Sequence, residues 1–197
     1  MKKGLIILGV IFVVILLLGG WVTSKYNGLV ALDEGVNKAW AQVQSQYQRR
    51  MDLIPNLVET VKGVANFEKS TITAVIEARA KATQVTLSPE LLNNPQAFQQ
   101  FERSQGELSS ALSRLLVTVE QYPNLKANEN FLQLQSQLEG TENRISVERN
   151  RFNTSVESFN KTRRSFPTNV IASFFNFQEK PYFQAQPGAE TAPKVQF

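Results

Sequence analysis

The pattern that most limits the fold is a helical repeat of apolar residues over positions 36–64. Apolar side chains recur there at alternating steps of three and four, and Arg50 is the one polar member of the series. The apolar members are Val36, Trp40, Val43, Tyr47, Ile54, Leu57, Val61 and Val64. Such steps place side chains on one face of an α-helix. Because a helix with this face is not stable alone in water, other helices must cover it.

Two arrangements of the chain fit residues 51–56. Asp52 could cap a new helix with Pro55 in its first turn, where the missing N–H group would have no partner within the helix anyway. Alternatively, Pro55 could kink one long helix. The apolar repeat continues through the proline, which favours the kink. A tight reversal would instead give two antiparallel neighbours, as a bundle requires.

An apolar run over residues 4–22 follows Lys2 and Lys3 and predicts a membrane anchor at residues 1–24. At about 1.5 Å per residue, the run can cross a hydrocarbon core of about 30 Å. A cleaved signal peptide is the alternative, but small residues in the A-x-A arrangement of a cleavage site are missing after Leu18.

The flanks of this run suggest how the anchor lies in the cell membrane. Trp21 and Tyr26 lie where an aromatic belt would sit, and Lys25 follows as an interfacial anchor. Two lysines and the amino terminus on one side oppose Lys25 on the other. The positive-inside rule therefore favours a single pass with a cytoplasmic N-terminus and an external domain.

Periodic apolar residues predict three further helical segments. The first covers about 53–84, the second covers about 98–122 and stops at Pro123, and the third starts at a cap on Asn128 and ends before Pro167. Their apolar faces include Leu57, Val61, Ile72, Val75, Phe98, Phe101, Leu108, Leu112, Leu115, Phe131, Leu138, Ile145, Phe152, Val156 and Phe159. The last segment is about 37 residues long, or about 55 Å.

The composition excludes most hydrolytic chemistry, because the chain contains no cysteine and no histidine. Ser-His-Asp and Cys-His nucleophiles, thiolate or imidazole zinc sites and Glu-x-x-His di-iron sites are therefore impossible. An enzyme that uses carboxylates or Mg²⁺ alone needs convergent acids, but Glu59, Glu68 and Glu77 recur every nine residues and so point in different directions. The net charge of +4 is spread along the chain and gives nucleic-acid binding little support. We expect no enzyme activity, metal or cofactor.

A polar cluster at the expected helix break is the first candidate site. It comprises Arg49, Arg50, Asp52 and Asn56. Aspartate suits a helix N-terminus and arginine suits a C-terminus, so we interpret the cluster as structural caps and ion pairs. A binding site for an acidic partner is the alternative.

An aromatic tail over residues 167–183 is the second candidate site. Its docking residues are Phe174, Phe175, Phe177, Tyr182 and Phe183. The tail could pack on the bundle, dip into the bilayer interface or dock a partner. Its prolines suit a wrapped coil better than an interfacial helix, which favours packing on the bundle. We expect residues 184–197, which are small, polar and proline-containing, to be disordered.

Three blocks of this sequence resemble the LemA family. They are residues 40–63, the block Tyr122, Pro123, Leu125, Lys126 and Ala127, and the tail with Phe166, Pro167, Asn169, Ile171, Phe174, Phe177, Lys180, Pro181, Tyr182 and Phe183. The resemblance implies a bacterial single-pass membrane protein with an all-α fold, an antiparallel up-and-down four-helix bundle over residues 25–166. It also favours the chain reversal at Asp52. The sequence departs from the family at Asn176, where glycine is expected and a tight turn is therefore in doubt, and at Val64, where an aromatic is more usual.

The resemblance implies no enzyme activity, and some relatives are associated with specialised membranes or with envelope proteases. We therefore expect a membrane-anchored interaction or scaffold protein of the bacterial envelope. The alternative is an accessory or regulatory subunit of an envelope machine such as a membrane protease. The expected partners are the lipid bilayer and either another protein or a second copy of the chain, and we expect neither nucleic acid nor a small-molecule ligand.

Overall fold

The computed structural model describes residues 2–63, 67–84 and 88–184, and every regular element among them is a helix. The elements are α1 (Lys2–Lys62), α2 (Lys69–Gln84), the 3₁₀-helix η1 (Pro89–Asn93), α3 (Pro95–Val119), α4 (Pro123–Lys126), α5 (Glu129–Arg164) and α6 (Thr168–Phe174). The expected all-α fold is therefore confirmed.

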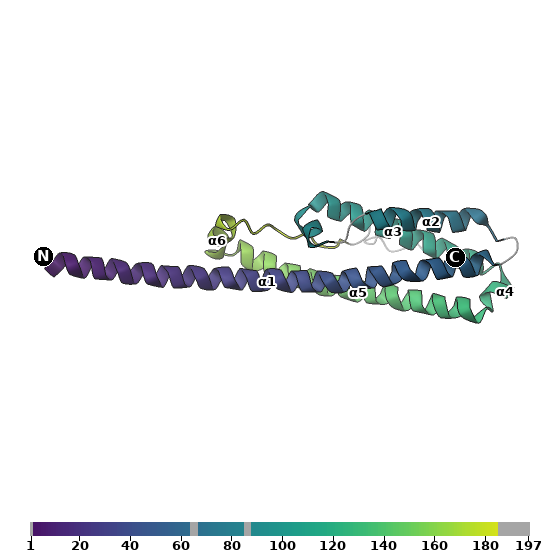
Figure 1. Ribbon diagram of the computed structural model, residues 1–197, viewed down its shortest axis with the longest axis horizontal. Coiled ribbons are helices and arrows are strands. Elements are labelled where there is room, and N and C mark those ends of the chain that lie inside the picture. Colours follow the sequence, from purple (N-terminus) through teal and green to yellow (C-terminus); the bar gives the residue numbers. More distant parts are fainter. Residues whose placement is uncertain (1, 64–66, 85–87, 185–197) are drawn as a thin grey trace, which may run out of the picture.

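The long helices alternate in direction along one axis, as expected for an up-and-down bundle (Figure 1). Helix α1 lies beside α5, and α2 lies beside α3. The N-terminal part of α1 protrudes from the bundle as a single helix. Asn94 caps α3 by accepting a hydrogen bond from Ala97 N, and Asn128 caps α5 by accepting one from Phe131 N, each at 3.1 Å. The expected cap on Asn128 is confirmed.

The chain does not reverse at Asp52, so the reversal expected from the family resemblance is wrong. Helix α1 continues through Pro55 to Lys62, and a turn follows at Gly63. The helix expected over 53–84 is therefore divided between α1 and α2. Proline at position 55 cannot donate to the carbonyl four residues earlier, that of Met51. Arg79 Nε of α2 donates to this carbonyl at 3.2 Å, so the neighbouring helix replaces the lost partner.

The apolar repeat faces the interior, as expected, and its described members from Val36 to Val61 are buried. Val64 lies outside the described residues. The core has two parts. The proximal core, nearer the protruding part of α1, surrounds Trp40, and the distal core contains Ile54 and Leu57 together with residues of α2, α3, α4 and α5. The ring of Trp40 lies 5.5–6.1 Å from four phenylalanine rings, those of Phe98, Phe101, Phe152 and Phe183.

The protruding part of α1 carries apolar side chains that no other part of the described chain covers. Leu8 and Leu17, for example, are 66% and 69% exposed. Among the described helices, α1 alone is long and apolar enough to cross a membrane, by length and composition. An exposed apolar helix of this length is unfavourable in water, whereas a bilayer would solvate it.

The tail turns at Asn176, where the resemblance had left a tight turn in doubt. Asn176 adopts a left-handed conformation with φ of 56°. Asparagine tolerates this region better than other non-glycine residues, so the turn forms without glycine. We expected residues 184–197 to be disordered. Of these, only Gln184 is among the described residues, so the expectation for the others stays a prediction.

Candidate functional site

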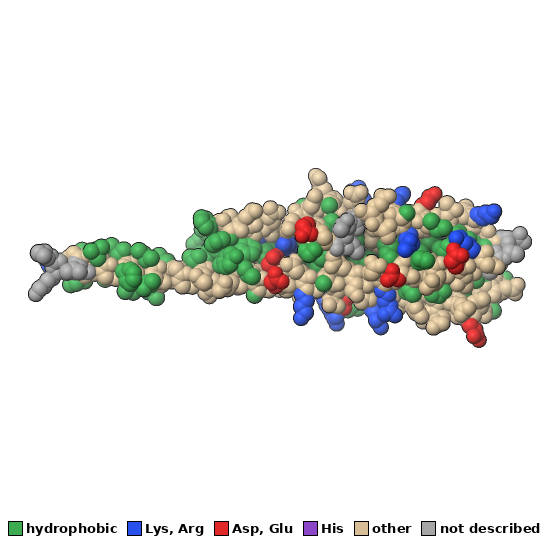
Figure 2. All heavy atoms as spheres, viewed as in Figure 1, with side chains coloured by type: hydrophobic (Ala, Val, Ile, Leu, Met, Phe, Trp, Pro, Cys, Tyr) green, Lys and Arg blue, Asp and Glu red, His purple; other side chains and the backbone are tan. Residues whose placement is uncertain are grey.

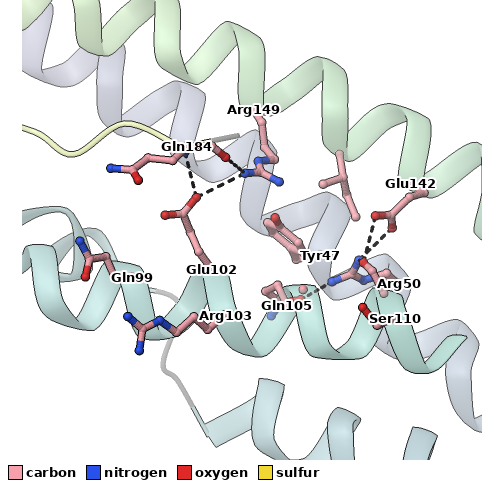
Figure 3. A pocket seen from close by; sticks show the side chains of 13 residues that line it. Tyr47, Arg50, Gln99, Glu102, Arg103, Gln105, Ser110, Glu142, Arg149 and Gln184 are labelled. Atoms are coloured by element: carbon pink, nitrogen blue, oxygen red, sulfur yellow. Dashed lines mark hydrogen bonds and ion pairs between the residues drawn. The ribbon is translucent and has the colours of Figure 1, made fainter. Parts of the chain in front are cut away.

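A polar layer centred on Arg50 lies between the proximal core and the distal core. Figure 3 shows the Arg50 side chain and the polar side chains around it. The Arg50 side chain comes from α1 and is 2% exposed. Its Nη1 donates hydrogen bonds to Ser109 Oγ at 2.9 Å and to Glu142 Oε2 at 2.8 Å. Its Nη2 donates to Gln105 Oε1. Ser109 Oγ in turn donates to Glu142 Oε1 at 3.2 Å. One arginine thus joins α1, α3 and α5.

The position of Arg50 in the apolar repeat explains why its charge lies inside the bundle. Residues 105 and 109 are one turn apart on α3, so both can face the same guanidinium. The guanidinium also lies 5.0 Å from the ring centroid of Tyr47. Glu142 is 49% exposed, so this ion pair is buried on the arginine side only. The layer is incompletely satisfied, since Arg50 Nε and Gln105 Nε2 are buried without a hydrogen-bond partner among the described residues.

A groove of about 510 Å³ opens beside this layer, between α3, α5 and the tail. It is lined by Tyr47, Arg50, Gln99, Glu102, Arg103, Gln105, Gly106, Ser109, Ser110, Glu142, Ile145, Arg149 and Gln184. A second ion pair crosses it, with Arg149 Nη2 and Glu102 Oε1 3.3 Å apart. The groove therefore presents three arginines and two glutamates. Arginine side chains bind carboxylates and phosphates well, because their fixed donors can form paired hydrogen bonds.

Burial changes two protonation equilibria in the groove. Burial raises the pKa of Glu102, an effect partly opposed by the hydrogen bond from Gln184 N and by the charge of Arg149. Burial likewise raises the pKa of Tyr47, so its phenol stays neutral at physiological pH.

The four residues of the first candidate site do not come together. Arg49, Asp52 and Asn56 are exposed, and only Arg50 enters the interior. Asp52 caps no helix, because α1 is continuous there, and its Oδ1 accepts a hydrogen bond from Gln48 Nε2 at 2.8 Å. Sequence reasoning missed the partners of Arg50, which are Gln105, Ser109 and Glu142. The available signal was Arg50 itself, a charged residue in a position whose neighbours in the repeat are apolar.

The five aromatics of the second candidate site divide between the interior and the surface. Phe183 is 6% exposed and lies in the proximal core. Phe177 is half-buried against Tyr26 and Phe159. The other three residues are exposed, namely Phe174, Phe175 and Tyr182.

Two asparagines of α5 hold the backbone of the tail. Asn160 Nδ2 donates to Lys180 O at 2.9 Å, and its Oδ1 accepts from Lys180 N at 3.0 Å. Asn153 makes the same pair of hydrogen bonds with Phe183, at 3.0 and 2.9 Å. Each asparagine therefore satisfies both backbone groups of one tail residue, as a neighbouring strand would.

The spacing of these pairs follows from helix and strand geometry. Residues 153 and 160 are seven positions apart, or about 10 Å along a helix. Residues 180 and 183 are three positions apart, which is also about 10 Å in extended chain. The extended tail thus runs antiparallel to α5 in register with its side chains.

Lys180 connects the tail to two further elements. Its side chain is 8% exposed, and its Nζ lies 3.0 Å from Asp33 Oδ1 of α1 and 3.0 Å from Asn93 Oδ1 of η1. The ammonium also lies 5.8 Å from the ring centroid of Phe159. A lysine this deeply buried requires such partners, so Lys180 fixes the tail across the proximal end of the bundle.

A known protein family matches the segment of the chain that contains Arg50 and the tail. The sequence profile of the LemA family matches residues 39–197. The chain belongs to the LemA family. The match contains the polar layer, the groove and the tail, and it begins after the apolar run.

Curated relatives extend over most of the chain. The magnetosome protein MamQ of Magnetospirillum gryphiswaldense is 24% identical over 183 residues, which is 85% of this chain and 67% of that protein. Magnetosome protein MamQ 2 of Paramagnetospirillum magneticum gives the same figures. Protein LemA of Metamycoplasma hominis is 24% identical over 165 residues, 82% of this chain and 70% of that protein.

The family resemblance seen in the sequence is therefore confirmed, and with the exposed apolar part of α1 it supports a membrane-associated protein. Neither the family description nor the names of these relatives denote an enzyme activity. Within residues 2–63, 67–84 and 88–184, no group of three or more Asp or Glu side chains is placed to hold a metal ion.

Proposed function

We propose that this LemA-family protein is a membrane-anchored scaffold that presents a protein-binding groove at a fixed distance from the bilayer. The observation that carries the proposal is the continuity of α1 from the apolar run to Arg50. Residues 22 and 50 are 28 positions apart, so the polar layer stands about 42 Å beyond the end of the run. A helix shared by anchor and bundle transmits position and tilt, which a flexible linker would not do.

The chemistry of the groove favours a polar protein segment as its occupant. Arg103 on the groove wall is exposed, so the N–H donors of its guanidinium can reach an occupant of the groove. An acidic or amide-rich segment could accept from these donors. The groove is open to solvent and its charges are of both signs, which suits a polar peptide better than a small apolar ligand.

The test is purification of the full-length chain from crosslinked membranes in mild detergent, followed by light scattering and mass spectrometry. A scaffold should give homo-oligomers or assemblies with several copies of the chain. One other protein in fixed stoichiometry would instead support the accessory-subunit alternative. A monomer without crosslinked partners would contradict both functions.

Reversing one charge in the groove tests whether assembly depends on the groove itself or on the overall charge of the chain. Arg103→Glu should weaken the assembly, because it places a carboxylate beside the site for an acidic or polar segment. Arg114→Glu is the matched control, since Arg114 is also exposed on α3 but lies outside the groove. Equal effects of the two substitutions would show that overall charge, and not the groove, controls assembly.

A further inference from the structure

Four exposed apolar side chains gather at the end of the bundle from which α1 protrudes. This end patch consists of Phe166, Val170, Phe174 and Phe175, which are 84%, 61%, 82% and 45% exposed. Figure 2 shows hydrophobic side chains concentrated at this end, beside the narrow protruding helix. Val170 and Phe174 are one turn apart on α6, whose opposite face buries Ile171 and Ala172.

The composition of the patch distinguishes it from the rest of the bundle surface. Beyond the apolar run, the exposed phenylalanines of the described chain all lie in this patch. The other exposed large hydrophobic residues of the bundle and tail are single side chains: Ile76, Val117, Leu132, Val147 and the less exposed Tyr182. Scattered aliphatic residues are normal on a surface, whereas clustered exposed phenylalanines mark a contact.

Ring contacts fix the depth of the patch relative to the apolar run. The ring centroid of Tyr26 lies 4.7 Å from that of Phe175 and 5.8 Å from that of Phe177. Tyr26 is four residues past position 22, or about 6 Å along α1. The headgroup region on each side of a bilayer is about 5–7 Å thick. If residues 4–22 span the hydrocarbon core, the patch therefore lies at the level of the headgroups.

Basic side chains border the patch on the side of α5. The last turn of α5 contains Lys161, Arg163 and Arg164, and Lys161 and Arg164 are exposed. Helix α5 runs toward the protruding part of α1, so this turn faces the same end (Figure 1). Basic residues around an aromatic surface are typical of proteins that bind anionic lipid interfaces.

We infer that the end patch inserts into the bilayer interface as a second membrane contact beside the α1 span. The aromatic rings enter the headgroup layer, and the exposed basic residues meet lipid phosphates. Two contacts keep the long axis of the bundle from tilting about the point where α1 leaves the membrane. The inference depends on the α1 span and not on a partner in the groove.

The test uses nitroxide labels on the full chain in nanodiscs of phosphatidylcholine and phosphatidylglycerol, with one chain per disc. The chain has no cysteine, so single-cysteine variants carry one label each. Val170→Cys reports on the patch and leaves its phenylalanines in place. Val117→Cys is the matched control, because Val117 is 69% exposed near the other end of the bundle. The measured quantities are collision rates with oxygen, which is enriched in lipid, and with a water-soluble nickel chelate.

The label at 170 should collide severalfold less often with the chelate than the label at 117, and more often with oxygen. Adding Phe166→Ser and Phe174→Ser to Val170→Cys should restore chelate access. Equal chelate access at 170 and 117 would overturn the inference. Shielding seen only in discs with two chains would also overturn it, since a second copy would then cover the patch.

Discussion

At the residue scale, Arg50 determines how the helices align. Its guanidinium meets Gln105 and Glu142 only when α1, α3 and α5 are in their observed register. A shift by one turn would leave a buried charge without partners, which costs several kcal/mol. With an apolar residue at position 50 the core could still form, but a shift of the helices by one turn would no longer bury an unpaired charge. We therefore interpret the layer as a device for specificity of packing, with a cost in stability.

The first prediction concerns Arg50→Ala. Truncating a large buried side chain to alanine leaves a cavity and costs about 2–5 kcal/mol, and here it also leaves Gln105 unpaired in the interior. Thermal unfolding of the full chain in detergent, followed by circular dichroism, should show a large loss. The double substitution Arg50→Met with Gln105→Leu should recover most of this lost stability, because both buried polar groups are gone.

Arg49→Ala, on the exposed side of α1, is the control for the first prediction. Similar losses for Arg49→Ala and Arg50→Ala would contradict the assignment.

The second prediction concerns the pH dependence contributed by Glu102. Burial raises its pKa above the ordinary value of 4.5, so the folded state holds this proton more tightly than the unfolded state does. The contribution of Glu102 to stability therefore falls as pH rises from the unfolded pKa through the folded pKa. Compared with Glu102→Gln, the wild-type chain should lose stability as the pH rises above about 4.5, the ordinary pKa of this side chain.

The comparison in the second prediction is clean because the chain has no histidine, the side chain that ordinarily titrates near neutral pH. The free energy of unfolding of both chains is measured at each pH in the same detergent. If the wild type instead gained stability relative to Glu102→Gln as pH rose, the pair with Arg149 would dominate and the pKa of Glu102 would be lowered.

At the element scale, the tail acts as a further layer of the bundle although it is not a helix. Asn153 and Asn160 supply the hydrogen bonds that a strand would supply, and Phe183 fills the space between α1, α3 and α5. Lys180 and Phe183, three residues apart, are both buried against the bundle, whereas Tyr182 between them is exposed.

The third prediction compares two adjacent aromatics of the tail. Phe183→Ala should cost about 3–5 kcal/mol, because it removes a ring packed against Trp40 and Phe152 and leaves a cavity. Tyr182→Ala should cost much less, since this side chain is 39% exposed. Thermal unfolding of the full chain measures both. Equal losses would mean that the two rings are equally buried and that the tail is placed differently.

The helices themselves could be predicted from sequence because their signals are local. The apolar repeat gives the buried face of α1, and Asn94 and Asn128 each cap the helix that follows. The apolar repeat also favoured one helix through Pro55, as observed, and it was the family resemblance that pointed to a reversal at Asp52. The compensation of the Met51 carbonyl, which Pro55 leaves without a partner, could not be predicted, because Arg79 belongs to another helix.

The candidate site was less predictable than the helices, because it forms from side chains that are far apart in the sequence. Arg50 was visible as an exception in the repeat, but its partners lie 55 to 92 residues away in sequence. No local pattern distinguishes Gln105 or Glu142 from other polar residues of their helices. Only the packed bundle brings them to one guanidinium.

At the scale of the whole molecule, α1 makes a single rod of the anchor and the bundle. With 61 residues it is about 90 Å long, and its first third has no helical neighbour in Figure 1. Asn27 and Gly28 are poor helix formers, and both lie where the rod meets the bundle. The helix nevertheless continues there, because Tyr26 and Leu29 pack against the proximal core. Packing thus overrides the local preference of the chain.

The last prediction tests whether the rod bends at this junction. Spin labels on Ser24→Cys and Glu59→Cys, which are 35 residues apart, should lie about 52 Å from each other along a straight helix. Labels on Ser45→Cys and Glu59→Cys lie within the bundle and should give about 21 Å. All three positions are exposed, so the labels should not disturb packing. Pulsed electron paramagnetic resonance of the full chain in nanodiscs should find narrow distributions for both pairs. A hinge at Asn27 and Gly28 would leave the shorter distance narrow while the longer one became broad and decreased, and the groove would then have no fixed height above the membrane.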